Sequence, residues 1–67
     1  MTNKEIVIEV LSMYNCCTSK EIVHFAKLRL NQNITSAQVA GILRSMISYN
    51  QAGSSKNDKN VTVYWLI

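Results

Sequence analysis

Apolar residues recur at helical spacing in three stretches of the chain, and each stretch begins with the same polar signal. The signal is a Thr followed three residues later by Glu or Gln, and it occurs at Thr2 and Glu5, Thr18 and Glu21, and Thr35 and Gln38. In this capping box the Thr hydroxyl accepts from the backbone N–H three residues on, and the Glu or Gln side chain bonds back to the Thr N–H. The pattern therefore predicts three helices that start beside these threonines.

The first two predicted helices have apolar faces that suit a core. The first covers about residues 4–15 and turns one stripe inward, formed by Ile6, Val7, Val10, Leu11, Met13 and Tyr14. Ile8 lies off this stripe, so we expect it to be exposed. The second covers residues 19–27, because Leu28 and Arg29 fall on the wrong sides of the helix. Asn15 suits a left-handed end for the first helix.

The third predicted helix, Ser36–Ser48, has two contrasting faces. Its inner face consists of Val39, Ile42, Leu43, Met46 and Ile47. Its outer face is small and weakly polar, with a single cation, and consists of Ala37, Gly41, Arg44, Ser45 and Ser48, with Gln38 on its flank. Such a helix can lie close against another surface.

The chain ends in a stretch that is typical of a β-hairpin. Residues 61–67 are rich in β-branched and aromatic side chains and form the strongest strand. Residues 51–55 are plausible only as its first arm, and residues 56–60 form a turn by composition. We expect Val61, Val63, Trp65 and Ile67 to cover the helices, with Thr62, Tyr64 and Leu66 on the other face. Tyr14, Phe25 and Trp65 are assigned to the core, and the fold class is α+β, mostly α, in one domain of residues 1–67.

Composition and charge bear on which partners, cofactors and activities the protein can be expected to have. The net charge is +3 with 16% charged residues, which leans mildly towards a polyanionic partner. No apolar run reaches about 18 residues, so we expect no membrane span and a cytoplasmic protein. Adjacent Cys16 and Cys17 with a lone His24 do not make a zinc site, and we expect both thiols to be buried or half-buried. With no paired carboxylates and no glycine-rich loop, neither an enzyme nor a cofactor is expected.

The order of elements resembles a winged helix-turn-helix domain. The resemblance also rests on Thr-Ser-Lys-Glu-Ile at residues 18–22 and on Val-Tyr-Trp-Leu at residues 63–66. In that family the third helix enters the major groove and the hairpin tip, the wing, reaches the flanking backbone or minor groove. Among winged helices, the size and the aromatic C-terminal strand resemble those of small regulators of bacterial pilus operons or of phages. The resemblance implies a DNA-binding transcription regulator whose wing tip is residues 55–60. Double-stranded DNA is the implied partner.

The candidate contacts follow from the chemistry of each side chain. Arg44 can bind a guanine edge with two hydrogen bonds, and Gln38 can read adenine, although its capping box competes for the same amide. Ser36, Ser45 and Ser48 can donate to phosphates or bases, while Ala37 and Gly41 allow close approach. Lys56 and Lys59 suit a wing that contacts phosphate. Lys20 near the start of the second helix can reach phosphate as well.

Two other interpretations stay open from the sequence. The small outer face of the third helix can pack against a protein, which would make the chain an interaction module, for instance a phage factor that binds a host protein. Lysines gathered on one side with Arg44 favour DNA, and scattered lysines favour protein. A homodimer is also possible through the apolar residues predicted to lie outside, which are Ile8, Leu28 and Leu66.

Overall fold

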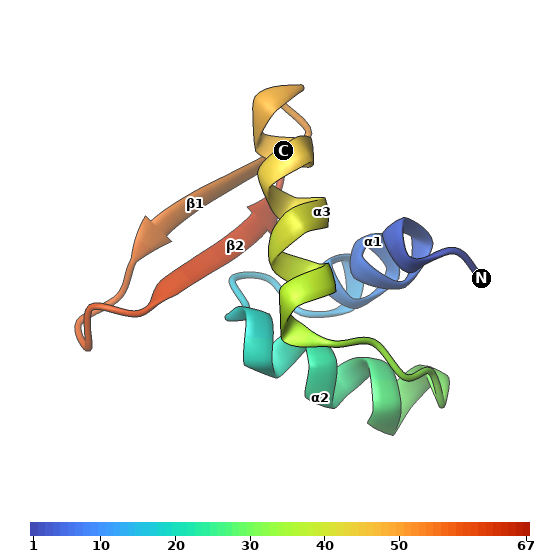
Figure 1. Ribbon diagram of the computed structural model, residues 1–67. Helices are drawn as coiled ribbons and strands as arrows, with labels where there is room; N and C mark the ends of the chain where they lie inside the picture. The colour runs from blue at the N-terminus through green and yellow to red at the C-terminus, as the bar shows by residue number, and fades with distance from the viewer.

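The computed structural model describes all 67 residues and consists of three helices followed by an antiparallel hairpin (Figure 1). The elements are α1 (Asn3–Met13), α2 (Ser19–Leu30), α3 (Ser36–Ser48), β1 (Ala52–Lys56) and β2 (Thr62–Leu66). This order confirms the predicted α+β, mostly helical fold and gives it a winged-helix-like topology. No helix combines the length and the apolar character that crossing a membrane requires.

All three predicted capping boxes form. The hydroxyls of Thr2, Thr18 and Thr35 accept from the backbone N–H three residues on, at 3.2, 3.1 and 3.1 Å. The return bonds to the threonine N–H measure 2.9, 2.9 and 3.0 Å. Each box satisfies N–H groups that the first helical turn leaves without an intrahelical partner. The helix starts were therefore readable from local sequence.

α3 ends at Ser48 as predicted, whereas the ends of α1 and α2 differ from the predicted ones. α2 continues to Leu30 instead of ending near Lys27, and Asn31 caps it in the left-handed conformation with φ 52°. Leu28 is 60% exposed, so backbone hydrogen bonding continues the helix although this side chain misses the core. At the end of α1 the left-handed residue is Cys16, with φ 60°, and not the predicted Asn15.

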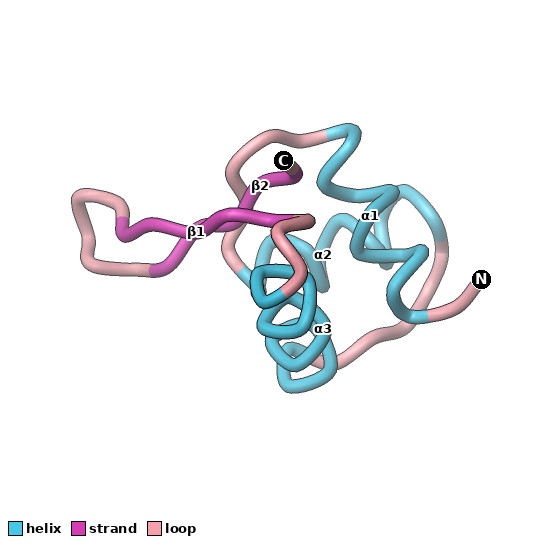
Figure 2. Tube along the Cα trace, turned by 90° about the horizontal axis from the view of Figure 1, so that it is seen from above, coloured by secondary structure: helices cyan, strands magenta, loops and turns pink.

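The core lies between the helices and the base of the hairpin. Its members are Ile6, Val7, Val10, Leu11, Cys17, Ile22, Ala26, Ile34, Val39, Leu43, Met46 and Ala52. No charged or polar side chain is among them. Met13, predicted to be in the inner stripe of α1, is 44% exposed, whereas Ile8 is exposed as predicted. Only one end of the hairpin lies against the helices, and its tip extends away from them (Figure 2).

The hairpin faces the helices with the opposite side from the one predicted. Ala52 pairs with Leu66 and is buried, and residues directly opposite in an antiparallel pair share a face. Leu66 and Tyr64 accordingly pack against the core. Trp65 and Val63 belong to the outer face, with Val61 44% and Ile67 78% exposed. The assignments of Trp65 to the core and of Leu66 to the outside were therefore wrong.

Two contacts explain this orientation. Tyr64 makes a short antiparallel bridge to Cys17, in which each backbone N–H donates to the other residue's carbonyl at 2.8 and 3.0 Å. On the outer face Trp65 lies over Gly53, where an added Cβ would come within 2.5 Å of the indole ring. The segment between α1 and α2 therefore anchors the inner face, while glycine makes room for the tryptophan on the outer face.

Candidate nucleic-acid interface

The outer face of α3 is exposed along its whole length. The five residues predicted to form this face are exposed, namely Ala37, Gly41, Arg44, Ser45 and Ser48. Gln38, on its flank, and Ser36, at the start of the helix, are exposed as well. On the other side of the helix Val39, Leu43 and Met46 are buried. The helix contains no acidic residue. A firmly packed helix thus presents a small, acid-free surface to solvent.

Arg44 stands alone on this surface. It takes part in none of the protein's side-chain hydrogen bonds. Arg29, in contrast, donates through Nε to the hydroxyl of Tyr14 at 2.7 Å, and Tyr14 stacks on Phe25 with ring centroids 4.0 Å apart. The guanidinium of Arg44 therefore keeps its five N–H donors available to a ligand.

Gly41 has no structural reason to be glycine. Its φ is not positive, and an added Cβ would meet no atom within 4 Å. Glycine in a helix interior lowers stability by about 1 kcal/mol relative to alanine. What Gly41 does provide is the absence of a side chain in the middle of the exposed face.

The hairpin tip is ordered by the side chain of Asn57 together with two backbone hydrogen bonds, from Asn57 N–H to the Val61 carbonyl and from Asn60 N–H to the Asn57 carbonyl. Oδ1 of Asn57 accepts from the backbone N–H of Lys59 at 2.9 Å and from that of Val61 at 3.1 Å. Asn60 completes the turn in the left-handed conformation, with φ 62°. Lys56 is the last residue of β1, paired with Thr62, so the connecting loop is residues 57–61 and not the predicted 55–60.

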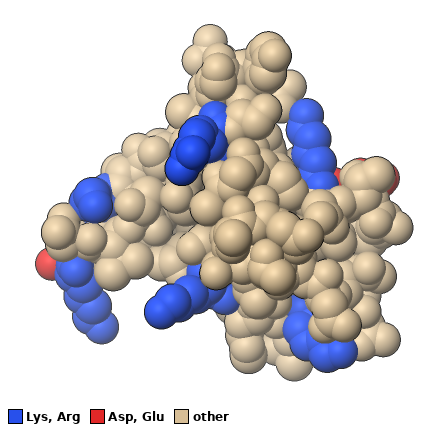
Figure 3. Space-filling model, viewed as in Figure 1, with Lys and Arg blue, Asp and Glu red and all other residues tan.

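When the molecule is viewed as in Figure 1, basic side chains lie over the hairpin, over α3, over both ends of α2 and between α3 and α1 (Figure 3). Acidic atoms show on this side only at the hairpin tip and at the edge of the molecule beyond α3. Lys20, Lys56 and Lys59 are all exposed, as the sequence predicted. Charge on this side is therefore mainly positive, although Asp58 lies between the two lysines of the hairpin.

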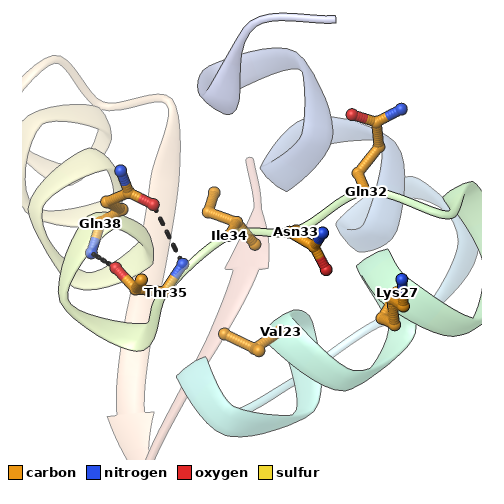
Figure 4. A pocket seen from close by; sticks show the side chains of 7 residues that line it. All are labelled: Val23, Lys27, Gln32, Asn33, Ile34, Thr35 and Gln38. Atoms are coloured by element: carbon orange, nitrogen blue, oxygen red, sulfur yellow. Dashed lines mark hydrogen bonds between the residues drawn. The ribbon is translucent and has the colours of Figure 1, made fainter.

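A shallow cavity of about 170 Å³ adjoins the first turn of α3 (Figure 4). It is lined by Val23, Lys27, Gln32, Asn33, Ile34, Thr35 and Gln38. Its polar lining consists of side-chain amides, a hydroxyl and one ammonium group, which lies 3.5 Å from Oδ1 of Asn31. The sequence did not indicate this cavity, because its walls come from α2 and from the connection between α2 and α3. Gln38 belongs both to the cavity and to the outer face of α3.

The cysteines have different environments. Cys17 is buried, and its Sγ lies 3.4 Å from the carbonyl oxygen of Tyr14. Burial raises the pKa of the Cys17 thiol, and the negative charge of Glu21 raises it further, so this thiol stays protonated at neutral pH. Cys16 is exposed, which corrects the expectation that both thiols are at least half-buried. No three His, Cys, Asp or Glu side chains are grouped so as to hold a metal ion.

The predicted site residues lie on three elements of the fold, which are α3, the hairpin and the first turn of α2. Seven of them are exposed residues of α3, and Lys56 and Lys59 belong to the hairpin, which projects beside that helix (Figures 1 and 3). Lys20 lies in the first turn of α2. The residue whose role the structure changes most is Gln38, because the carbonyl oxygen of its side chain is committed to the cap. No protein-family model, curated protein or solved structure matches this chain.

Proposed function

We propose that the protein is a DNA-binding transcription regulator that places α3 in the major groove and contacts the flanking phosphates with its hairpin. The observation that carries the proposal is the outer face of α3, which is exposed, free of acid and equipped with an unpartnered Arg44. A major groove about 12 Å wide admits an α-helix, and Arg is the side chain that most often reads guanine there.

The distribution of charge supports the same proposal. Phosphate contacts by Lys and Arg supply most of the sequence-independent affinity for DNA. The lysines of the hairpin and Lys20, in the first turn of α2, are exposed, whereas Glu5 and Glu9 belong to α1. The hairpin is well suited to contact phosphates, because the Asn57 hydrogen bonds order its tip before any ligand arrives.

A protein partner is the second candidate, and the outer face of β2 favours it. Val61 and Ile67 are exposed there, beside the half-buried Val63 and Trp65, and this face carries no charge. This surface shares no residue with the outer face of α3. The two candidates therefore differ in which variants should abolish binding.

The proposal is tested by the affinity for a random-sequence DNA duplex, measured by fluorescence anisotropy over a series of salt concentrations. We expect log Kd to rise linearly with log salt, with a slope of about 0.9 for each phosphate contacted. Absence of binding at low salt would contradict the proposal, and the outer face of β2 would then be probed with protein partners.

Removing either lysine of the hairpin should weaken binding to all sequences alike. We expect Lys56→Gln and Lys59→Gln each to lower the salt slope by about 1, because each change removes one phosphate contact. The matched control is Lys4→Gln, which removes the same charge from the first turn of α1. If Lys4→Gln lowers the slope as much as the hairpin variants do, net charge and not the hairpin governs affinity.

Gly41→Ala should separate stability from binding. We expect the melting temperature to rise by about 4–8 °C, because alanine favours the helix interior by about 1 kcal/mol and its Cβ meets no neighbour. Affinity for DNA should fall, because the methyl group stands where the helix must approach the bases. Thermal unfolding followed by circular dichroism and the same anisotropy titration check both effects. A variant that is more stable and binds as tightly as the wild type would place the contact surface elsewhere.

A further inference from the structure

The three capping boxes differ in one chemical respect. α1 and α2 use a carboxylate at the third helical position, Glu5 and Glu21, whereas α3 uses the neutral Gln38. A negative charge near a helix N-terminus is favoured by the helix dipole, so the carboxylate is the better capping group. The return bonds in the three boxes are nearly equal, at 2.9, 2.9 and 3.0 Å. Capping therefore does not explain why α3 carries an amide.

The amide of Gln38 has a defined orientation. Its Oε1 accepts from the backbone N–H of Thr35, and its side-chain nitrogen points away from the cap (Figure 4). No group of the protein accepts from this nitrogen. The residue is exposed, so two N–H donors project from the first turn of α3 towards solvent in a fixed direction. Because Oε1 is turned towards the Thr35 N–H, the group that Gln38 presents to a ligand is its NH₂ donor.

We propose that Gln38 determines sequence specificity by donating to guanine in the major groove, an inference that rests on the proposed function. Adenine presents both a donor and an acceptor on its major-groove edge, and glutamine reads it by donating and accepting together. The capping box holds the amide oxygen against the Thr35 N–H, so the group left facing outward is the donor. Guanine is the base that presents two acceptors and no donor on this edge, O6 and N7. The outward NH₂ group of Gln38 matches that edge.

The decisive variant is Gln38→Glu. It keeps the capping hydrogen bonds and replaces the outward hydrogen-bond donor with an acceptor. Glu occupies the same position in the other two boxes of this chain, so the variant should melt at or above the wild-type temperature. The outward atom becomes a carboxylate oxygen, which accepts and cannot donate. A carboxylate in the major groove pairs with the N4 amino group of cytosine.

The measurement is selection from a pool of randomised DNA duplexes, followed by sequencing of the bound fraction, with wild type and variant in parallel. We expect the wild type to enrich guanine at one position where Gln38→Glu enriches cytosine. The variant should bind the wild-type site about 5- to 150-fold more weakly, the range for one good base contact. Lys4→Gln controls for the change in net charge, which is −1 in both variants. Gln38→Met, which removes the donors without adding charge, should lose the guanine preference and acquire no other.

Each remaining outcome decides against the proposal in a recognisable way. If Gln38→Glu and Gln38→Met enrich the same bases as the wild type, Gln38 does not read a base. A loss that exceeds that of Lys4→Gln but is equal for all sequences would identify a phosphate contact instead. If the wild type binds no member of the pool, the proposed function itself fails. A wild type that binds DNA with unchanged specificity in the variants refutes only the role of Gln38.

Discussion

Leu43→Ala should lower the free energy of unfolding by about 2–5 kcal/mol, the range for deleting a buried leucine side chain. Leu43 is 0% exposed and lies on the inner side of α3, in the core with Val39 and Met46. Domains are stable by roughly 0.05–0.15 kcal/mol per residue, so a chain of this length has about 3–10 kcal/mol in all. Urea unfolding followed by circular dichroism measures the loss directly.

A matched control for this variant is Leu28→Ala. The substitution is chemically identical and also lies in a helix, but Leu28 is 60% exposed. We expect its effect to stay within about 0.5 kcal/mol, as for most surface substitutions. Equal losses from the two variants would contradict the assignment of Leu43 to the core and of Leu28 to the surface.

Arg44→Ala should weaken binding to a selected DNA site by about 1–3 kcal/mol and leave the unfolding free energy nearly unchanged. The guanidinium makes no hydrogen bond within the protein, so its removal costs the fold little. In the proposed complex the same group donates two hydrogen bonds to one guanine, and these are lost together. Anisotropy titrations with the enriched duplex and with a random duplex separate the specific loss from the general one.

Two further arginine variants test whether the effect of Arg44→Ala comes from charge alone or from the shape and position of the guanidinium. Arg44→Lys keeps the charge but not the planar fork, so it should retain the salt dependence and lose specificity. Arg29→Ala removes the same side chain from α2, where it is engaged by Tyr14, and should reduce binding only as far as its charge contributes. Wild-type specificity in Arg44→Ala would show that the bases are read by other residues.

Leu43 and Arg44 are neighbours in the chain with opposite expected effects. Leu43→Ala should strongly lower the stability of the protein. Arg44→Ala should leave the protein folded but weaken its binding to a specific DNA site. The separation arises because successive residues of a helix point about 100° apart, so one side chain reaches the core and the next reaches solvent. Stability and recognition can therefore be tested independently on α3.

Local chemistry determined much of this fold from the sequence alone. Each helix begins beside a Thr that the capping box identifies, because both partners of the box lie within four residues of one another. The outer face of α3, and with it the exposure of Arg44, followed from the helical period. The turn of the hairpin also followed from composition, although Lys56 belongs to β1 and not to the loop.

The folded backbone and its side-chain contacts decided other features that the helical period did not predict. Helical period placed Leu28 and Arg29 on unfavourable sides, yet α2 continues through them to Asn31, and Arg29 bonds to a tyrosine fifteen residues earlier in the chain. The sequence predicted only that the capping box and a DNA base would compete for the side-chain amide of Gln38. In the folded chain the cap holds the carbonyl oxygen and leaves the NH₂ group outside.

In the hairpin, the sequence determined the two faces of β2, and the tertiary structure determined which face is buried. Alternation along β2 divided its side chains into the correct two sets, but both sets contain large apolar residues, and the more apolar set faces outward. The buried set was chosen by the bridge between Tyr64 and Cys17 and by the burial of Ala52 opposite Leu66. A period of two defines two faces from the sequence, but only pairing with a distant segment decides which of them is buried.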